Sequence, residues 1–448
     1  MARICVVGLW HQASVLSACL ADLGHQVCGV GDDPGAVRAL AAGRAPVRER
    51  RLNGILRRNL KAGRLRYLVD YGEALREAEF AYLALDTPVD AEDRSDLDPV
   101  FAAADRMGAN LSGDLILCVT AQVPVGTCEE LAARLARQAP RFSCRVVYVP
   151  EFLRLNAAVE HFRRADRIII GAQDPGTAAR VAELYAPLKR PLRITGLRTA
   201  EMAKHASNAF LAASISFINE IADLCEVSGA DALEVARAMK LDRRIGTHAF
   251  LSPGLGFAGG TLGREIRSLQ QLARRRGRST ALLDAVMTVN LARPRRVAET
   301  LRRLYPSLDG LQAGVLGLTY KPGTSTLRRS AAFEIIAELT AAGVRIQAYD
   351  PLANLSEAPD GPPFQVCPDP YTAAGGSDAL VLITEWPGIG ELDLARLRDA
   401  MRRPVLLDTR NFFDPERMRE LGFLYFGIGR GGASDAAQPA EHTSEARP

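Results

Sequence analysis

The chain has 448 residues, of which 48% are hydrophobic, so it can bury a large core and is expected to fold into two or three domains. Its formal net charge of +4, with 24% charged residues, gives no reason to expect binding to nucleic acid or to an anionic membrane. No segment has the length and hydropathy of a membrane span, and no signal peptide is expected. The eight cysteines form no CxxC pair, which predicts free thiols and a cytoplasmic location. No metal site is expected.

The first part of the chain alternates between β-branched runs and helix-like segments, which predicts a mostly parallel sheet with helices on both faces. A helix expected at 14–23 is followed by Gly24, a residue that suits the C-terminal cap. Another helix is expected at 127–137. The predicted strands are 4–7, 27–30, 80–85, 115–120, 145–149 and 167–170.

Helical periodicity dominates from about residue 199. The stretch 199–227 contains no proline and is predicted to form one long helix that bridges two halves of the chain. A further helix is expected over 281–304, with Pro294 kinking or interrupting it. Alternation then resumes, with strands expected at 315–318, 344–349, 379–383 and 405–407 and a helix at 331–342, which predicts a second, smaller α/β domain.

The first predicted strand and helix are joined by the segment VVGLWHQA at 6–13. A dinucleotide-binding protein has its phosphate loop at this place, with the pattern G-x-G-x-x-G or G-x-G-x-x-A. Gly8 and Ala13 fit the first and last positions, but Trp10 occupies the middle one, where glycine lets the backbone approach the pyrophosphate. Two alternatives follow: either the Trp10 ring swings away from the phosphates, or it packs in the core and the loop has another shape.

Eight segments, in order, resemble the UDP-glucose/GDP-mannose dehydrogenase family over residues 3–430. They are VPVGT at 123–127, PEFLR at 150–154, KHASNAFLAASISFINEIADLCE at 204–226, RIGTHAFLSPGLGF at 244–257, LGLTYKP at 316–322, ITEW at 383–386, DTRN at 408–411 and LGFLYFGIGR at 421–430. The resemblance implies an α/β fold. Its expected parts are a Rossmann-like, doubly wound NAD-binding domain at 1–198, a helical dimerisation domain at 199–305, a smaller Rossmann-like nucleotide-sugar-binding domain at 306–430 and a disordered tail at 431–448.

The resemblance further implies NAD-dependent oxidation of a UDP-sugar of the UDP-glucose type at C6, from alcohol to carboxylate, through a thioester on a cysteine. The family's nucleophile motif, roughly G-x-G-F-G-G-S-C-[FL]-P-K-D, is GLGFAGGTLGRE at 254–265 in this chain. Thr261 stands in the Cys position and Glu265 in the Asp position. A thiolate is available near neutral pH, whereas an aliphatic hydroxyl needs an adjacent base to attack. Complete two-step oxidation is therefore not expected, and the alternative is an inactive homologue that binds a nucleotide sugar.

The family pattern also implies roles for individual residues. Glu151 is implied to serve in acid/base chemistry, and Lys204 and Asn208, one helical turn apart, to contact the reacting end of the sugar. From the residues alone, Glu151 could instead be a carboxylate at a helix start, and Lys204 a solvated helix charge.

The implied substrate-binding residues are Phe152, Leu153, Arg154, Gly254, Gly256, Phe257, Lys321, Arg328, Arg410 and, from a neighbouring subunit, Arg244. The implied cofactor-binding residues are Gly8, Leu9, Trp10, Asp32, Thr87 and Gln122. Asp32 enters this set because Gly31 occupies the slot of the acidic residue that grips the ribose, and a one-residue shift would let Asp32 serve. The expected partners are NAD, a UDP-linked nucleotide sugar and a second copy of the chain.

Overall fold

The computed structural model describes residues 1–90, 95–327, 329–358 and 364–431. The chain forms two compact units: the first comprises 1–207 and 267–279, and the second comprises 208–266 and the chain from Thr280 onward. Two helices, α9 (Leu197–Ser228) and α11 (Leu262–Arg275), contribute to both units. The tail predicted at 431–448 lies outside the described residues apart from Gly431.

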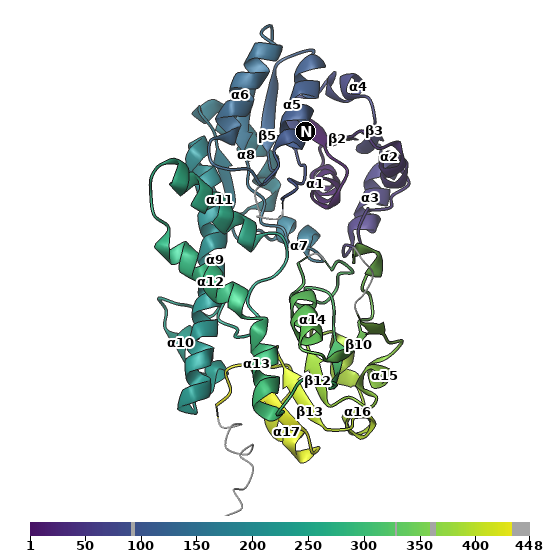
Figure 1. Ribbon diagram of the computed structural model, residues 1–448. Coiled ribbons are helices and arrows are strands. Elements are labelled where there is room, and N and C mark those ends of the chain that lie inside the picture. The colour runs from purple at the N-terminus through teal and green to yellow at the C-terminus, as the bar shows by residue number, and fades with distance from the viewer. Residues whose placement is uncertain (91–94, 328, 359–363, 432–448) are drawn as a thin grey trace, which may run out of the picture. The chain divides into compact units, whose positions relative to one another are not determined.

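Residues 1–207 of the first unit run from purple to teal in Figure 1. The unit is built on a sheet with the strand order β3-β2-β1-β4-β5-β6-β7-β8. Strands β1 to β6 pair in parallel, β7 pairs antiparallel with β6, and β8 is parallel to β7. The chain leaves β1 toward one edge and returns at β4 toward the other, which is the doubly wound topology. The strands are β1 (Arg3–Val7), β2 (Gln26–Val30), β3 (Leu65–Leu68), β4 (Phe80–Leu83), β5 (Leu115–Val119), β6 (Cys144–Tyr148), β7 (Ile168–Gly171) and β8 (Leu192–Thr195).

Helices cover both faces of this sheet because its strands are apolar on both sides. Along β1, Ile4 and Val6 enter one core cluster, whereas Cys5 and Val7 enter the other. The first cluster contains residues of α1 (His11–Asp22), α2 (Pro34–Ala41), α3 (Leu52–Lys61), α7 (Ala158–Arg163) and α8 (Pro175–Tyr185). The second contains residues of α4 (Tyr71–Leu75), α5 (Asp98–Ala109), α6 (Thr127–Gln138) and the beginning of α9. A 3-10 helix, η1 (Ala186–Leu188), follows α8.

The second unit contains a smaller sheet of entirely parallel strands in the order β11-β10-β9-β12-β13-β14. Its strands are β9 (Gln312–Leu316), β10 (Arg345–Tyr349), β11 (Gln365–Val366), β12 (Ala379–Leu382), β13 (Val405–Asp408) and β14 (Leu424–Gly427). One face is covered by α13 (Arg295–Leu304) and α14 (Ala331–Ala341), and the other by α15 (Pro370–Ala374), α16 (Leu394–Ala400) and α17 (Pro415–Glu420). The remaining elements are α10 (Ala232–Leu241), α12 (Ala281–Ala292), η2 (Leu355–Glu357) and η3 (Pro387–Glu391).

The structure confirms the predicted fold class, including the long central helix and the second parallel sheet. Pro294 interrupts the helix expected at 281–304, since α12 ends at Ala292 and α13 begins at Arg295. The sequence did not predict β3 or β8, which form the two edges of the larger sheet and carry exposed residues. The boundaries proposed for the individual domains stay predictions.

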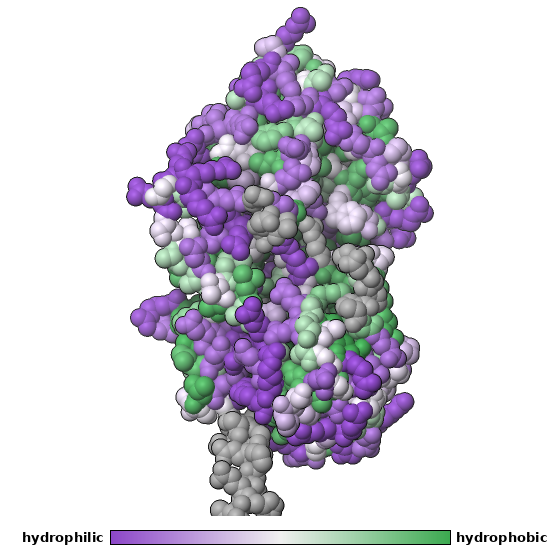
Figure 2. Space-filling model, viewed as in Figure 1, coloured by the Kyte–Doolittle hydropathy of each residue, from purple (hydrophilic) through white to green (hydrophobic). Residues whose placement is uncertain are grey.

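The surface seen in Figure 2 is covered mainly by hydrophilic side chains, with hydrophobic residues reaching it in separate patches. Among the residues that the structure describes, no helix combines the length and the hydropathy required to cross a membrane.

The turn after β9 yields a prediction about stability. Gly317 has φ +93°, and a Cβ added there would lie 2.4 Å from Cβ of Thr384 and 2.6 Å from its backbone nitrogen. We expect Gly317→Ala to lower the free energy of unfolding of this unit by about 3 kcal/mol or more, because backbone strain and a clash with backbone add together. Chemical denaturation followed by the fluorescence of buried Trp386, in a Trp10→Phe background, measures the loss.

Gly310→Ala is the matched control, since Gly310 has φ +79° but nothing lies within 4 Å of an added Cβ. This variant should lose only about 1–2 kcal/mol, the cost of a left-handed conformation for a residue with a Cβ. Equal losses in the two variants would contradict the argument from the clash.

Candidate active site

In the first unit, Lys204 of α9 contacts the segment that follows β6. Its ammonium group donates to the backbone carbonyl of Glu151 and lies 3.7 Å from Oε1 of the Glu151 carboxylate. It also lies 4.8 Å from the centre of the Phe152 ring, and the guanidinium of Arg167 lies 4.5 Å from the same ring centre. Lys204 is buried, so it is not a solvated helix charge. Glu151 does not begin a helix either; its carboxylate accepts from the backbone nitrogen of Leu153 at 2.6 Å.

The same region of α9 holds the VPVGT segment through two further buried side chains. Glu201 accepts from the backbone nitrogens of Gly126 at 2.6 Å and Cys128 at 2.9 Å, and Nε2 of His205 lies 3.0 Å from the carbonyl of Val123. Gly126 is the N-cap of α6 and has no side chain to cap it, so the Glu201 carboxylate satisfies the first N–H groups of that helix. Neither Glu201 nor His205 was predicted from the sequence. The available signal was that Glu201 lies three positions before Lys204 and four before His205 in a long helix.

The residues between β1 and α1 fit a dinucleotide diphosphate. Gly8 has φ +121°, and a Cβ added there would lie 2.7 Å from the carbonyl oxygen of Ala84, so only glycine permits this close approach at the end of β1. Ala13 is buried, as the close packing of α1 on the sheet requires. Trp10 is the N-cap of α1 but makes no side-chain capping hydrogen bond, and no acidic residue stands in the first turn. The helix N-terminus therefore retains its favourable field for an anion.

Trp10 does not pack in the core, because 53% of its surface is exposed. Leu9 explains the loss of the acidic residue at the end of β2: a Cβ added to Gly31 would lie 2.7 Å from Cγ of Leu9, so a larger residue at 31 would collide with it. Asp32 is exposed and pairs with Arg106 at 2.5 Å. Thr87 is buried and donates through its hydroxyl to the carbonyl of Gln122 at 3.0 Å. Binding of NAD by these individual residues stays a prediction.

In the second unit, Thr261 directly precedes α11, and its carbonyl accepts from the backbone nitrogen of Glu265 at 3.1 Å. Its side chain is exposed. Glu265 is fully buried and accepts from the side-chain amide of Asn208 at 3.1 Å. The Glu265 carboxylate is therefore engaged with Asn208.

The loop at 254–257 is held at both ends by side-chain groups. At Gly254, the backbone nitrogen donates to Oδ1 of Asn219 at 2.8 Å, and the carbonyl accepts from Nε of Arg293 at 3.2 Å. At Phe257, Asn290 accepts from the backbone nitrogen at 2.7 Å and donates to the carbonyl at 3.1 Å. The loop was predicted from the sequence, but Asn219, Asn290 and Arg293 were not. They lie 33 to 39 residues away from their partners along the chain.

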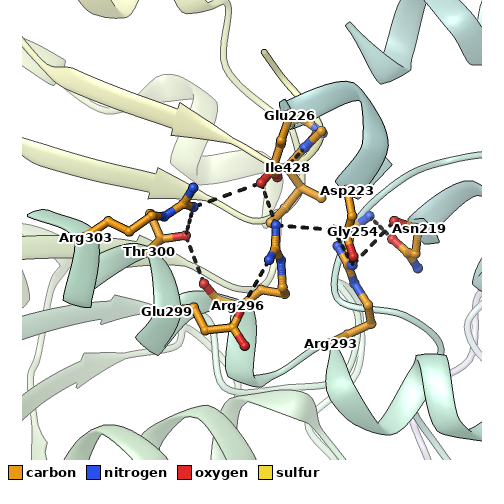
Figure 3. Close-up of polar contacts among 12 residues, drawn as sticks. Asn219, Asp223, Glu226, Gly254, Arg293, Arg296, Glu299, Thr300, Arg303 and Ile428 are labelled. Atoms are coloured by element: carbon orange, nitrogen blue, oxygen red, sulfur yellow. Dashed lines mark hydrogen bonds and ion pairs between the residues drawn. The ribbon is translucent and has the colours of Figure 1, made fainter. Parts of the chain in front are cut away.

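Figure 3 shows the ion pairs that support this loop. Arg293 is 2% exposed and contacts both oxygens of Asp223 at 2.7 and 2.8 Å. Arg296, one turn further along, pairs with Glu226 at 2.5 Å and with Glu299 at 3.0 Å. Glu226 also accepts from the backbone nitrogen of Gly429 at 2.9 Å. One network of ion pairs and hydrogen bonds thus joins helix α9, the loop at Gly254 and the segment after β14.

The other predicted residues of the second unit lie around the same loop or on the surface. A Cβ added to Gly259 would lie 3.2 Å from the ring of Tyr320, which neighbours Lys321, and Gly254 approaches the carbonyl of Thr409, which neighbours Arg410. Arg410 donates to the carbonyl of Ile383 and pairs with Glu385. The remaining residues are Gly256 at φ +82°, Arg244, exposed and paired with Asp242, and Arg328, which lies outside the described residues. In the first unit, Arg154 is exposed and its backbone nitrogen donates to Nδ1 of His161.

The cysteines of the chain do not offer a readily available thiolate. All eight are free thiols, and seven of them are buried. Burial raises the pKa of each one, to about 12 for half-buried Cys144 and to about 11 for Cys28. Among the described residues, no group of three His, Cys, Asp or Glu side chains is placed to hold a metal ion.

Comparisons with known proteins identify one family along most of the chain. Three family models match in order: the NAD-binding domain of the UDP-glucose/GDP-mannose dehydrogenase family at residues 2–189, its central domain at 198–292 and its UDP-binding domain at 314–415. The chain is 39% identical to a UDP-glucose 6-dehydrogenase of Pseudomonas aeruginosa, over 96% of this chain and 97% of that one. It is 35% identical to the UDP-glucose 6-dehydrogenase TuaD of Bacillus subtilis, over 96% and 94% of the two chains. The structure of a UDP-glucose dehydrogenase from Pyrobaculum islandicum aligns with a TM-score of 0.88 at 33% identity, over 96% of this chain and 98% of that one.

The ion pairs in Figure 3 yield a prediction about stability. We expect Asp223→Ala to lower the free energy of unfolding by about 3 kcal/mol, because it leaves the buried Arg293 guanidinium without its anion. Glu299→Ala removes an exposed partner of Arg296 and should cost less than about 1 kcal/mol. Chemical denaturation of both variants measures the difference, and similar losses would show that Arg293 does not depend on Asp223.

Proposed function

The chain belongs to the UDP-glucose/GDP-mannose dehydrogenase family, and we propose that it oxidises C6 of a UDP-sugar of the UDP-glucose type once, from alcohol to aldehyde. The N-terminal domain is the family's NAD-binding domain, so the cofactor is NAD. The observation that carries the single step is Thr261: an exposed threonine stands where the family's nucleophile motif has its cysteine. The relatives named above support UDP-glucose as the first substrate to test.

Oxidation of the alcohol removes a hydride from C6 and a proton from its oxygen. When bound, NAD supplies the hydride acceptor. Lys204 is a buried cation that can stabilise the negative charge that develops on the sugar oxygen. Glu151, with its carboxylate 3.7 Å from the Lys204 ammonium, can accept the proton directly or through a water molecule. Asn208 is assigned to orient the same end of the sugar, with Glu265 fixing the direction of its amide.

The second oxidation needs a group that adds to the aldehyde and carries the resulting acyl group. An aliphatic hydroxyl remains protonated at neutral pH, so Thr261 cannot add without a base to accept its proton. The eight cysteines cannot take over, because burial keeps their pKa values above the usual range. The product expected of this chain is therefore the aldehyde, released into water as its hydrate.

The second unit is assigned the nucleotide diphosphate. Its glycine-rich loop begins at Gly254, and Lys321 and Arg410 are cations next to residues that approach Gly259 and Gly254. Uridine as the base follows from the family's UDP-binding domain. A cytoplasmic location completes the proposal, since eight free thiols suit a reducing compartment.

A second copy of the chain is the proposed protein partner. Phe210, Phe217 and Leu224 are spaced seven residues apart on α9, and 72%, 48% and 57% of their surfaces are exposed. Residues at this spacing lie on one side of a helix, so they form an apolar stripe. Leu282 and Leu291 of α12 are also exposed in the same unit. Large apolar side chains in a row favour burial against another protein surface over exposure to water.

The stoichiometry of the reaction tests the proposed activity. With limiting UDP-glucose and excess NAD, we expect one NADH per sugar, measured by absorbance, because oxidation stops at the aldehyde. Two NADH per sugar would contradict the single step. No NADH, combined with UDP-glucose binding seen by calorimetry, would instead identify an inactive nucleotide-sugar binder.

Two substitutions at the same position sharpen this test. Thr261→Ser retains a hydroxyl and should leave the yield at one NADH. We also expect Thr261→Cys to leave it at one, because Arg264, which stands in the Lys position of the family's nucleophile motif, remains in place. Lys204→Met should lower kcat by about 100-fold or more if its cation stabilises the developing charge, and an unchanged kcat would exclude that role.

The apolar stripe gives a prediction about the oligomeric state. We expect the chain to have twice its mass of 48.4 kDa in light scattering after size-exclusion chromatography. Phe217→Glu should convert it to the monomer, because it places a charge in the middle of the stripe. Leu241→Glu, at an exposed residue at the end of α10, is the control and should stay dimeric. A monomeric wild-type chain would exclude the proposed dimer.

A further inference from the structure

The Glu49 carboxylate is buried in the first unit and joins two segments for which the family resemblance implies different ligands. Its side chain has no exposed surface. Oε2 accepts from Nε2 of His11 at 2.8 Å and from the backbone nitrogen of Asn156 at 2.8 Å. Oε1 accepts from the backbone nitrogens of Ala158 at 3.1 Å and Arg50 at 3.1 Å. Four donors thus surround one carboxylate.

His11 is the first residue of α1 and follows Trp10 in the loop assigned to the dinucleotide. Because the Glu49 carboxylate only accepts, its 2.8 Å contact requires a proton on Nε2 of His11. Gln12, the next residue, is fixed separately through its side-chain amide, which donates to the carbonyl of Thr120 at 2.9 Å. The N-terminus of α1 is therefore tied to Glu49 by one side chain, that of His11.

Asn156 and Ala158 lie just after Phe152, Leu153 and Arg154, the segment assigned to the nucleotide sugar. Asn156 has φ +69°, a left-handed conformation that costs free energy even for asparagine, and its backbone N–H is one of those held by Glu49. The N-cap of α7 at Ala157 has no side-chain cap, so the Glu49 carboxylate also satisfies an N–H group at the start of that helix. The backbone at Asn156 and Ala158 is thus held by Glu49, which lies more than 100 positions earlier in the chain.

We propose that Glu49 is a positioning residue that couples the cofactor site to the nucleotide-sugar site. A ligand that orders the N-terminus of α1 fixes His11, and through Glu49 it also fixes the backbone of 156–158 in the conformation that the sugar segment needs. The coupling is reciprocal. When NAD or the nucleotide sugar has already ordered these segments, the other ligand binds without the entropic cost of ordering them. The inference rests on the proposed function, but its test does not require turnover.

Calorimetry measures the coupling directly. The dissociation constant of UDP-glucose is determined with and without saturating NADH, which fills the cofactor site but cannot accept a hydride, and the ratio of the two is the coupling factor. We expect the wild type to bind UDP-glucose about fivefold or more tightly with NADH present, within the usual range of coupling between sites. Glu49→Gln should bring the factor close to one. The carboxylate oxygens accept from two donors each, whereas glutamine has one oxygen that accepts, and its NH2 group would face two of the donors without accepting from them.

His11→Ala is the second variant, and it keeps the bonds from Glu49 to the backbone while removing the link to α1. A direct effect of this variant on NADH affinity cancels in the ratio, so its factor should also fall close to one. Asp105→Asn is the control: it removes a carboxylate that joins α5 to α6 through Arg134 and Gln138, in the other core cluster of the unit, and should retain the wild-type factor.

Hydrogen exchange gives an independent readout. NAD alone should slow amide exchange at 154–160 in the wild type but not in His11→Ala. Wild-type protein that binds both ligands with a factor of one would overturn the coupling and leave the proposed function intact, whereas failure to bind either ligand would overturn both. A wild-type factor retained in both Glu49→Gln and His11→Ala would show that another route carries the coupling.

Discussion

The polar side chains buried along α9 constrain the rest of the molecule, because each must find a partner or cost about 1–3 kcal/mol. In the first unit, Glu201 and His205 meet this need at the VPVGT segment, and Lys204 meets it at Glu151. In the second unit, Asn219 does so at Gly254. In each unit, side chains of α9 therefore hold loops that contain candidate site residues.

A threonine at residue 261 fits within this framework. Thr261 directly precedes α11, and its carbonyl accepts from the backbone nitrogen of Glu265. The buried side chains of Asn208 and Glu265 are hydrogen-bonded to each other in the second unit. The difference between a thiol and a hydroxyl is several orders of magnitude in acidity, which no packing interaction compensates. Under the proposed function, the scaffold keeps its fold and its ligand segments while its reaction stops one step earlier.

Periodicity and turn residues predicted the fold well. The run at 199–227, the proline at 294 and the glycine at 8 each specify local geometry, and the structure has a helix, an interruption and a tight turn at those places. Sequence did not predict Glu49, Asn219 or Asn290, since their partners are 33 to 109 residues away and a lone polar residue carries no periodic signal. Trp10 also could not be placed from sequence, because a tryptophan suits either a core or an exposed helix N-terminus.

The state of C6 after reaction tests the central claim most directly. UDP-glucose labelled with carbon-13 at C6 is incubated with NAD and the purified chain, and the labelled carbon is followed by NMR until the signal is constant. The account predicts the resonance of a hydrated aldehyde as the final state. Conversion to a carboxylate resonance, with an acyl adduct on Thr261 in the intact-protein mass spectrum, would contradict it.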